Sequence, residues 1–351
     1  MMLLRTHGSG RARTAAVAAI ALSLALVATG CSSDAGSAGG TDDAGGDANL
    51  AITFLPKNLG NPYFDTSDNG GKTAIEEFGG TYAEVGPVEA TPDGQVSYIN
   101  TLTQQGVGAI VISANDPKAI GGALTEARDA GVKVVTFDSD TDPEYRDVFI
   151  NQADAEGIAK VQVDLIAEQI GDAGEVAILS ASANATNQNA WIELMKEELA
   201  TNHPNITLVE TVYGDDDDQT SFDKTAALLQ SHPNLKGIMS PTTVGIAAAA
   251  RYLQTSEYKG TVALTGLGTP NQMREYIEDE TVTAFALWNP ADLGYLAAFA
   301  AKALIVGDIT GKDGDTFEAG KLGSYTVGED GVVLLGDPYE FNKDNIADFD
   351  F

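Results

Sequence analysis

The sequence predicts an α/β protein made of two doubly wound parallel-sheet domains. Short runs of four to seven residues, rich in Val and Ile and bounded by Gly, Pro, Asn or Asp, alternate with longer amphipathic segments. Apolar runs of this kind are typical of strands that are buried on both faces of a parallel sheet. The alternation occurs twice, over roughly 300 residues, which is enough chain for two domains of ordinary size.

The elements follow one another in a regular order. Strands are predicted at residues 50–55, 109–113, 132–137, 176–180, 206–212, 237–240, 262–266 and 283–287. Helices, with apolar residues at a spacing of about 3.6, are predicted at residues 70–78, 95–105, 119–130, 155–170, 190–199, 222–230, 247–253 and 293–306. Continuous strand–helix alternation favours doubly wound sheets over a sandwich or a helical bundle.

The domain organisation is predicted from the same alternation. Because a long helix follows the last strand, we expect the chain to cross several times between the domains through a hinge. The expected first domain comprises residues 50–151 and 267–289, and the second comprises residues 152–266 and 290–345. The carboxyl ends of the two sets of strands should face each other, and a ligand should bind in the cleft between them.

The N-terminal 30 residues have the pattern of a signal peptide. Three arginines precede an apolar stretch, residues 15–28, that is shorter than the roughly 20 residues of a membrane-spanning helix. It ends in Ala28-Thr29-Gly30-Cys31, which resembles a bacterial lipobox. Residues 31–49 are almost entirely Ser, Gly, Asp, Ala and Thr, the composition of a disordered tether. We therefore expect export and anchoring to the outer face of the cell membrane through lipidated Cys31; an ordinary secretory signal is the alternative.

Charge and cysteine content exclude several classes of protein. The formal net charge is −31, which excludes general nucleic-acid binding because that requires a basic surface. Cys31 is the only cysteine, so no intramolecular disulfide can form. An acidic body suits a neutral or cationic small ligand.

Polar and aromatic residues gather in six segments that follow predicted strands. These segments are residues 55–64, 136–140, 186–191, 240–245, 266–271 and 286–295. Taken together and in this order, they resemble the type I periplasmic sugar-binding proteins, in the branch that holds the rhamnose-binding and autoinducer-2-binding proteins. The run Trp-Asn-Pro-Ala-Asp-Leu-Gly-Tyr at residues 288–295 is more similar to the rhamnose members. Autoinducer-2 binders tend to have Asp-Gln where this chain has Asn187 and Gln188.

The resemblance implies a function and its partners. It implies a monomeric solute-binding protein that closes on a small neutral sugar or polyol by a hinge and docks on the membrane permease of an ABC importer. Uptake of autoinducer-2, or a sensory protein that hands its ligand to a membrane receptor, are the alternatives. An exported enzyme that uses Asp138 and Asp140 as paired carboxylates is a third class, and no other residue of the sequence supports it.

The resemblance also implies a set of ligand contacts. Side chains are expected to contact the ligand at Lys57, Asp138, Asn187 and Gln188, and backbone groups at Pro241 and Thr243, with Asn61 and Asp292 as further candidates. The chemistry agrees, because a polyol requires groups that make several hydrogen bonds each, together with flat apolar walls. Asn289 adds hydrogen-bonding capacity, and the walls could be Tyr63, Phe64, Trp191 and Trp288.

Each candidate also has a purely structural interpretation. Lys57 could be a solvated loop residue, Asp138 could cap a turn or helix, and Asn187 could cap the helix that follows it. The two tryptophans could be core residues.

Other motifs do not predict further chemistry. The four consecutive acids at residues 215–218 lack the alternate spacing and the glycine of a calcium-binding loop. One of the residues at 218–219 is instead expected to start a helix. Gly266 and Gly268 lack the rest of a dinucleotide-binding fingerprint. No catalytic triad and no metal-ligand cluster is visible, so we expect no metal, no cofactor and no enzymatic activity.

Overall fold

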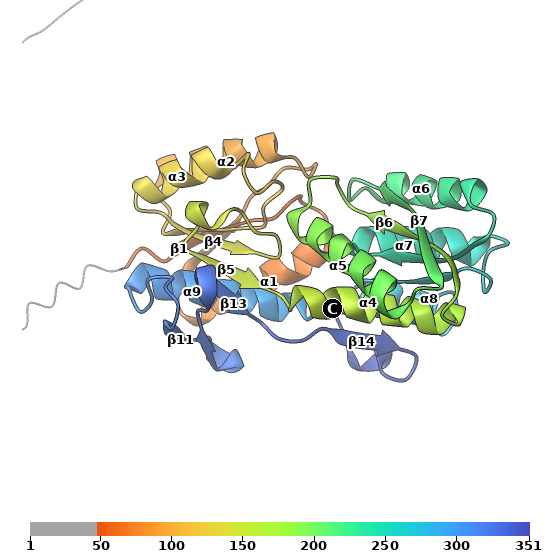
Figure 1. Ribbon diagram of the computed structural model, residues 1–351. Helices are drawn as coiled ribbons and strands as arrows, with labels where there is room; N and C mark the ends of the chain where they lie inside the picture. Colours follow the sequence, from red (N-terminus) through yellow and green to blue (C-terminus); the bar gives the residue numbers. More distant parts are fainter. Residues whose placement is uncertain (1–47) are drawn as a thin grey trace, which may run out of the picture. The chain divides into compact units, whose positions relative to one another are not determined.

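The computed structural model describes residues 48–351 (Figure 1). The expected signal peptide, Cys31 and nearly all of the expected tether lie outside the described residues. Among the residues that are described, the helices are too short or too polar to cross a membrane.

Strands and helices alternate along most of the described chain. The strands are β1 (Ala51–Leu55), β2 (Thr81–Glu84), β3 (Ala109–Ile112), β4 (Lys133–Phe137), β5 (Val148–Asn151), β6 (Gly174–Ser180), β7 (Ile206–Tyr213), β8 (Leu235–Ser240), β9 (Ala263–Gly266), β10 (Ala284–Leu287), β11 (Thr316–Glu318), β12 (Ser324–Thr326), β13 (Val332–Leu334) and β14 (Tyr339–Asn342). The helices are α1 (Pro62–Glu77), α2 (Pro92–Gln105), α3 (Gly121–Asp129), α4 (Ala155–Ile170), α5 (Thr186–Asn202), α6 (Asp218–Ser231), α7 (Thr243–Thr255), α8 (Pro270–Glu278) and α9 (Pro290–Val306). The predicted α/β class with two parallel sheets is confirmed.

The first lobe is built on a six-stranded parallel sheet with the order β13-β5-β4-β3-β1-β2. Its four inner strands, β5, β4, β3 and β1, are buried on both faces, so side chains that alternate along a strand enter two different layers. Ile110 and Ile112 on β3 pack with residues of α2 and α3. Ala109 and Val111 face the opposite side and belong to the cluster that contains α1 and α9. Two pairs of helices therefore cover the two faces (Figure 1).

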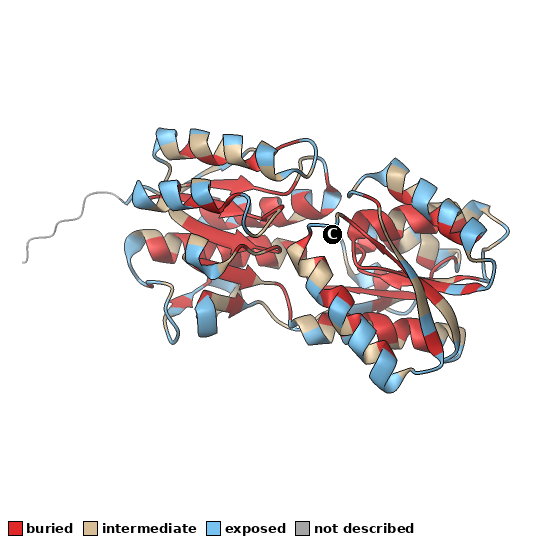
Figure 2. Ribbon diagram, turned by 45° about the horizontal axis from the view of Figure 1, so that its top comes forward, coloured by how far each residue is buried: buried red, intermediate tan, exposed pale blue. Residues whose placement is uncertain are grey.

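The second lobe is built on a four-stranded parallel sheet with the order β7-β6-β8-β9. Strand β10 continues this sheet through a parallel bridge between Leu267 and Ala286, and β14 pairs antiparallel with β10. Apolar residues of α4 and α5 pack on one face, and those of α6 and α7 pack on the other. Figure 2 shows the same pattern, with buried strands inside and exposed outer helix faces.

Two late segments lie in the opposite lobes from those that the sequence analysis assigned. Residues 267–289 were expected in the first domain, but β10 lies beside β9. Residues 290–345 were expected in the second lobe, but most of them lie in the first, because α9 packs on α1 and β4 and β13 pairs in parallel with β5. Strand β14, which pairs with β10, lies in the expected second lobe. Helix α9 is apolar on nearly all sides, so it requires a site that is buried all round. The first sheet and α1 together provide that site, a choice that local sequence does not encode.

Helix α1 starts at Pro62, eight residues before the predicted start at residue 70. The Asn61 side chain accepts a hydrogen bond from the Tyr63 backbone N–H at 3.1 Å. A capping Asn followed by Pro at the first helical position is a strong start signal. Gly70 and Gly71, in the middle of the helix, interrupt its pattern of apolar residues, so the pattern did not indicate a start at residue 62.

Gly70 on α1 and Gly294 on α9 allow these two helices to cross in close contact. A Cβ atom added at Gly70 would overlap the carbonyl oxygen of Ala291, and one added at Gly294 would overlap the carbonyl oxygen of Ser67. The two helix backbones therefore touch directly. This crossing fixes Tyr63, in the first turn of α1, next to Trp288, which precedes α9.

Candidate ligand-binding site

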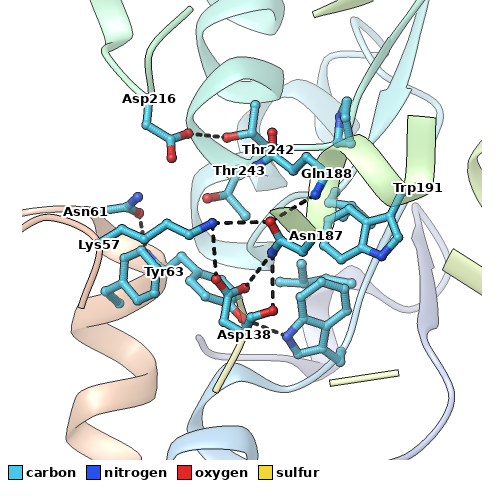
Figure 3. Close-up of a pocket in the computed structure, with 15 residues that line it drawn as sticks. Lys57, Asn61, Tyr63, Asp138, Asn187, Gln188, Trp191, Asp216, Thr242 and Thr243 are labelled. Carbon is cyan, nitrogen blue, oxygen red and sulfur yellow. Dashed lines mark hydrogen bonds and ion pairs between the residues drawn. The ribbon is translucent and has the colours of Figure 1, made fainter. Parts of the chain in front are cut away.

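A cavity lies where the carboxyl ends of strands from both lobes meet (Figure 3). The space inside it, open mouth included, is about 360 Å³. The residues that line it are Lys57, Asn61, Tyr63, Phe64, Asp138, Asn187, Gln188, Trp191, Asp216, Pro241, Thr242, Thr243, Leu267, Leu287 and Trp288.

The polar centre of the cavity is a network of Lys57, Asp138 and Asn187. The Lys57 ammonium lies 3.5 Å from Asp138 Oδ2 and donates to Asn187 Oδ1 at 3.2 Å. Asn187 Nδ2 in turn donates to Asp138 Oδ1 at 3.4 Å. Lys57 and Asp138 are only 4 % and 5 % exposed. Because a buried charge is costly unless an opposite charge compensates it, each of the two stabilises the charged form of the other. The network joins two loops of the first lobe to the first turn of α5 in the second lobe.

Asp138 is held in a backbone conformation that few residues adopt. It follows β4 directly and has a φ of 59°, in the left-handed region. Asp tolerates this region better than most non-glycine residues, although the conformation still costs on the order of 1 kcal/mol. The Ser113 hydroxyl donates to Asp138 Oδ2 at 2.8 Å. The neighbouring strand thus fixes the direction in which the carboxylate points.

Aromatic rings form one wall of the cavity. The rings of Tyr63 and Trp288 meet edge to face at 6.1 Å, and those of Trp191 and Trp288 meet at 5.9 Å. Burial, reinforced by the Asp138 carboxylate, raises the pKa of the Tyr63 hydroxyl well above its usual value. Tyr63 is therefore a neutral phenol that accepts a hydrogen bond from Trp288 Nε1 at 2.9 Å. These rings are both core residues and cavity wall.

Gln188 is fixed at one end of its side chain. Its Oε1 accepts hydrogen bonds from the Ser180 hydroxyl at 2.7 Å and from the Ala181 N–H at 2.8 Å. Within residues 48–351 the Gln188 amide nitrogen has no protein acceptor. The strand end thus sets the orientation of this amide, and its two N–H groups remain for another partner.

Most of the expected contact residues line the cavity. The exceptions are Asn289 and Asp292. Asn289 caps α9 by accepting from the backbone N–H groups of residues 291 and 292, and Asp292 pairs with Lys321 at 2.7 Å. Asn187 is not a helix cap, because α5 begins at residue 186 with Ala185 as its cap.

Four lining residues were not expected from the sequence: Asp216, Thr242, Leu267 and Leu287. Asp216 belongs to the acidic run at residues 215–218, where its neighbour Asp217 caps α6. In sequence the run is four equivalent acids, so no local signal separates the one residue that faces the cavity. Leu287 ends a buried strand and was assigned to it. Leu267 directly follows a buried strand and was included only as part of the loop segment at residues 266–271.

Asp140 does not share the cavity with Asp138. Its two carboxylate oxygens accept from Arg146 Nε at 2.6 Å and Arg146 Nη2 at 2.8 Å, a bidentate pair. Arg146 also donates to the Asp330 carbonyl at 2.7 Å and so ties this loop to the segment before β13. The two carboxylates are thus not arranged as the catalytic pair considered above.

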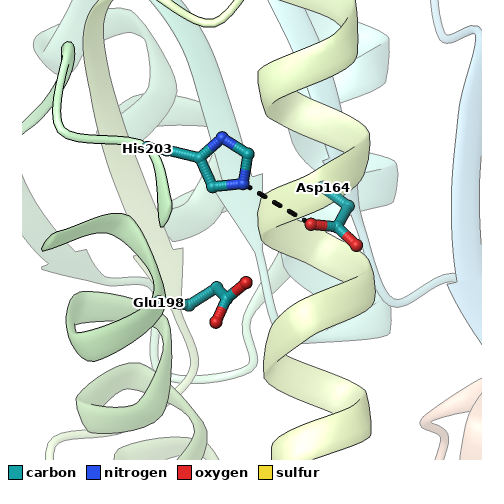
Figure 4. A group of neighbouring side chains, drawn as sticks. All are labelled: Asp164, Glu198 and His203. Atoms are coloured by element: carbon teal, nitrogen blue, oxygen red, sulfur yellow. Dashed lines mark ion pairs between the residues drawn. The ribbon is translucent and has the colours of Figure 1, made fainter. Parts of the chain in front are cut away.

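A group of possible metal ligands among the described residues, Asp164, Glu198 and His203, lies on α4, on α5 and directly after α5 (Figure 4). The Lys160 ammonium already lies 2.6 Å from Asp164 and 3.6 Å from Glu198. His203 Nδ1 lies 2.6 Å from Asp172 Oδ1. The arrangement is accounted for as an ion-pair network between two packed helices.

The comparisons with known proteins agree with this architecture. Residues 52–309 match the family described as periplasmic binding protein domain. A sugar ABC transporter structure from Actinomyces odontolyticus is 54 % identical, covering 87 % of this chain and 99 % of its own, with a TM-score of 0.70. A solute binding protein from Clostridium phytofermentas with bound L-rhamnose is 41 % identical, covering 85 % and 97 %, with a TM-score of 0.82. LsrB from Clostridium saccharobutylicum in complex with AI-2 is 28 % identical, covering 86 % and 99 %, with a TM-score of 0.80.

The matched residues span most of both lobes and include every cavity-lining residue. The chain therefore belongs to the type I periplasmic binding protein family, alongside the sugar-binding proteins of ABC importers.

Proposed function

We propose that this protein is the extracytoplasmic solute-binding protein of an ABC importer and binds a small neutral sugar, with L-rhamnose as the first candidate. The observation that carries the proposal is the cavity at the carboxyl ends of both sheets. It combines a buried Lys57–Asp138 pair, two amide side chains and an aromatic wall. Such a set can donate to and accept from several hydroxyl groups while the rings cover apolar C–H faces.

Binding without chemistry is supported by how the polar groups are engaged. Asp138, Asn187 and Gln188 are each oriented by neighbouring protein groups. A ligand that enters can replace the weak contacts of Lys57 and Asn187, at 3.2–3.5 Å, with hydrogen bonds of its own.

The choice of L-rhamnose is supported by the relative from Clostridium phytofermentas, which was solved with this sugar and is 41 % identical over 97 % of its length. The relative solved with AI-2 is 28 % identical. We therefore rank AI-2 as the second candidate ligand. A role in sensing, with transfer of the closed form to a membrane receptor, uses the same cavity.

The test is a binding screen by calorimetry on the purified chain with L-rhamnose, AI-2, D-ribose and erythritol. We expect L-rhamnose to bind tightest, with a Kd in the micromolar range or below, and to be recovered chemically unchanged. Tighter binding of AI-2 would make AI-2 the proposed ligand in place of L-rhamnose, and the protein would still be proposed as a solute-binding protein. A chain that binds no sugar or polyol of the screen would contradict the proposal.

The proposal has two further parts. The protein is exported and anchored through Cys31, and it docks on a permease as a monomer. The wild-type chain should be found in the membrane fraction and carry acyl groups, and Cys31→Ala should be released. Acyl groups on the Cys31→Ala chain, or a wild-type chain without acyl groups, would contradict anchoring through Cys31.

A further inference from the structure

Asp216 faces the cavity from the second lobe, opposite the Lys57–Asp138 pair (Figure 3). It lies in the turn between β7 and α6. Backbone hydrogen bonds from Gly214 to Ser180 and from Asp215 to Ala181, both 2.9 Å, attach this turn to the end of β6. The turn is therefore part of the same strand-end platform that carries Gln188.

The local backbone directs the Asp216 carboxylate into the cavity. Asp215 and Asp216 both have a positive φ, 55° and 50°, so two successive non-glycine residues adopt the left-handed region. The Thr242 hydroxyl donates to Asp216 Oδ1 at 2.6 Å. Asp217 then caps α6 by accepting from the Thr220 N–H at 2.7 Å. Among the four acids at residues 215–218, Asp216 is the residue whose side chain is hydrogen-bonded to another residue that lines the cavity, Thr242.

The charge of Asp216 has no close cation within the described chain. Burial raises the pKa of its carboxyl, the Asp138 carboxylate raises it further, and Lys57 across the cavity partly opposes both. The Lys57 ammonium pairs with Asp138 instead. Only one of the acceptor sites of the Asp216 carboxylate is used, by Thr242, whereas an ionised carboxylate offers about four.

We infer that Asp216 is a specificity residue: its carboxylate accepts hydrogen bonds from ligand hydroxyl groups and rejects ligands that carry a carboxylate or phosphate group. The inference rests on the proposed function and deepens it. With Asp138 in one lobe and Asp216 in the other, a polyol can donate to both carboxylates at once. A single ligand would then link the two lobes, whereas an anionic ligand would meet two negative charges and one positive charge.

The experiment measures L-rhamnose and its sugar acid, L-rhamnonate, by calorimetry against the wild-type chain, Asp216→Asn and Asp215→Asn. Asn keeps the acceptor for Thr242 and tolerates a positive φ, so Asp216→Asn preserves the turn. Asp215→Asn is the matched control, because Asp215 is the adjacent acid with the same backbone conformation and is exposed.

Asp216→Asn should weaken L-rhamnose binding at least tenfold and shift the ratio of the two affinities toward L-rhamnonate by about tenfold. Asp215→Asn should leave both affinities within twofold. A general defect in the turn would weaken both ligands equally, and that result would overturn the inference. Equal L-rhamnose affinities for the wild-type chain and Asp216→Asn would also overturn it and leave the proposed function standing. A wild-type chain that binds none of the screened sugars would overturn both.

Discussion

The indole N–H of Trp288 donates a hydrogen bond to the hydroxyl of Tyr63 at 2.9 Å, between residues that are 225 positions apart. Trp288 follows β10 of the second lobe, and Tyr63 lies in the first turn of α1 in the first lobe. Both side chains are almost completely buried, at 2 % and 4 % exposure. The bond therefore fixes the aromatic wall of the cavity at the point where the chain passes from β10 to α9.

Tyr63→Phe should destabilise the fold, because it leaves a buried indole N–H without an acceptor. The expected loss is about 1–3 kcal/mol in the free energy of unfolding, measured by urea denaturation. Tyr82→Phe is the control, since the Tyr82 hydroxyl bonds to Glu84 at an exposed position and its loss should cost less than about 0.5 kcal/mol. Equal effects of the two substitutions would show that the Trp288 bond does not stabilise the wall.

Asp138→Asn should separate the charge of this residue from its backbone role. Asn tolerates the left-handed conformation and can still accept from Ser113, but it no longer neutralises the buried Lys57. We expect ligand affinity to fall by about 100-fold or more, equivalent to roughly 2.7 kcal/mol, in the calorimetric assay. Asp138→Ala adds backbone strain and should also unfold at lower urea concentration. Ligand affinity retained in Asp138→Asn would remove the carboxylate from the binding site.

Gly294→Ala should disrupt the crossing of α1 and α9. The new Cβ would overlap the Ser67 carbonyl oxygen, and backbone atoms cannot move aside as a flexible side chain can. We expect a loss of about 3 kcal/mol or more, at the upper end for single substitutions, or failure to fold, read from the thermal transition. Gly122→Ala, in a helix with no atom near the added Cβ, should instead stabilise by about 0.5–1 kcal/mol. A neutral Gly294→Ala would contradict the close crossing.

Asp68→Asn should stabilise the protein at neutral pH. Asp68 is 1 % exposed and accepts one hydrogen bond, from Ser67 at 2.9 Å. Burial raises the pKa of its carboxyl well above the usual value. Because the unfolded state releases this proton first, wild-type stability falls as pH rises from about 4 toward the folded-state pKa.

The stability gain of Asp68→Asn over the wild-type chain should therefore grow from about pH 4 to pH 7, measured by urea denaturation across that range. Asp65→Asn, an exposed acid in the first turn of the same helix, should show no such growth. A constant difference between the Asp68→Asn and wild-type chains would mean that Asp68 is ionised in the fold.

Local sequence was sufficient for strands whose environment is uniform. The runs around Ile52, Val111 and Val135 are apolar because both faces of the sheet are covered, so their burial is readable without the fold. Strand β2 was not predicted, since it is a short edge strand with mostly exposed residues. The start of α1 was missed although Asn61 and Pro62 form its cap, because Gly70 and Gly71 weaken the helical pattern.

The sequence by itself determined the α/β class and the position of the polar loops at strand ends, because each of these depends on a short stretch of chain. Most residues of the cavity were implied by the resemblance of six loop segments to a known family. Only the tertiary structure decided which sheet receives α9 and β13, that Asn289 and Asp292 point to other partners, and which acid of residues 215–218 faces the cavity. These outcomes depend on contacts between segments far apart in sequence. The Asp216–Thr242 bond requires that the second sheet has folded, and the Trp288–Tyr63 bond requires that both lobes have packed together.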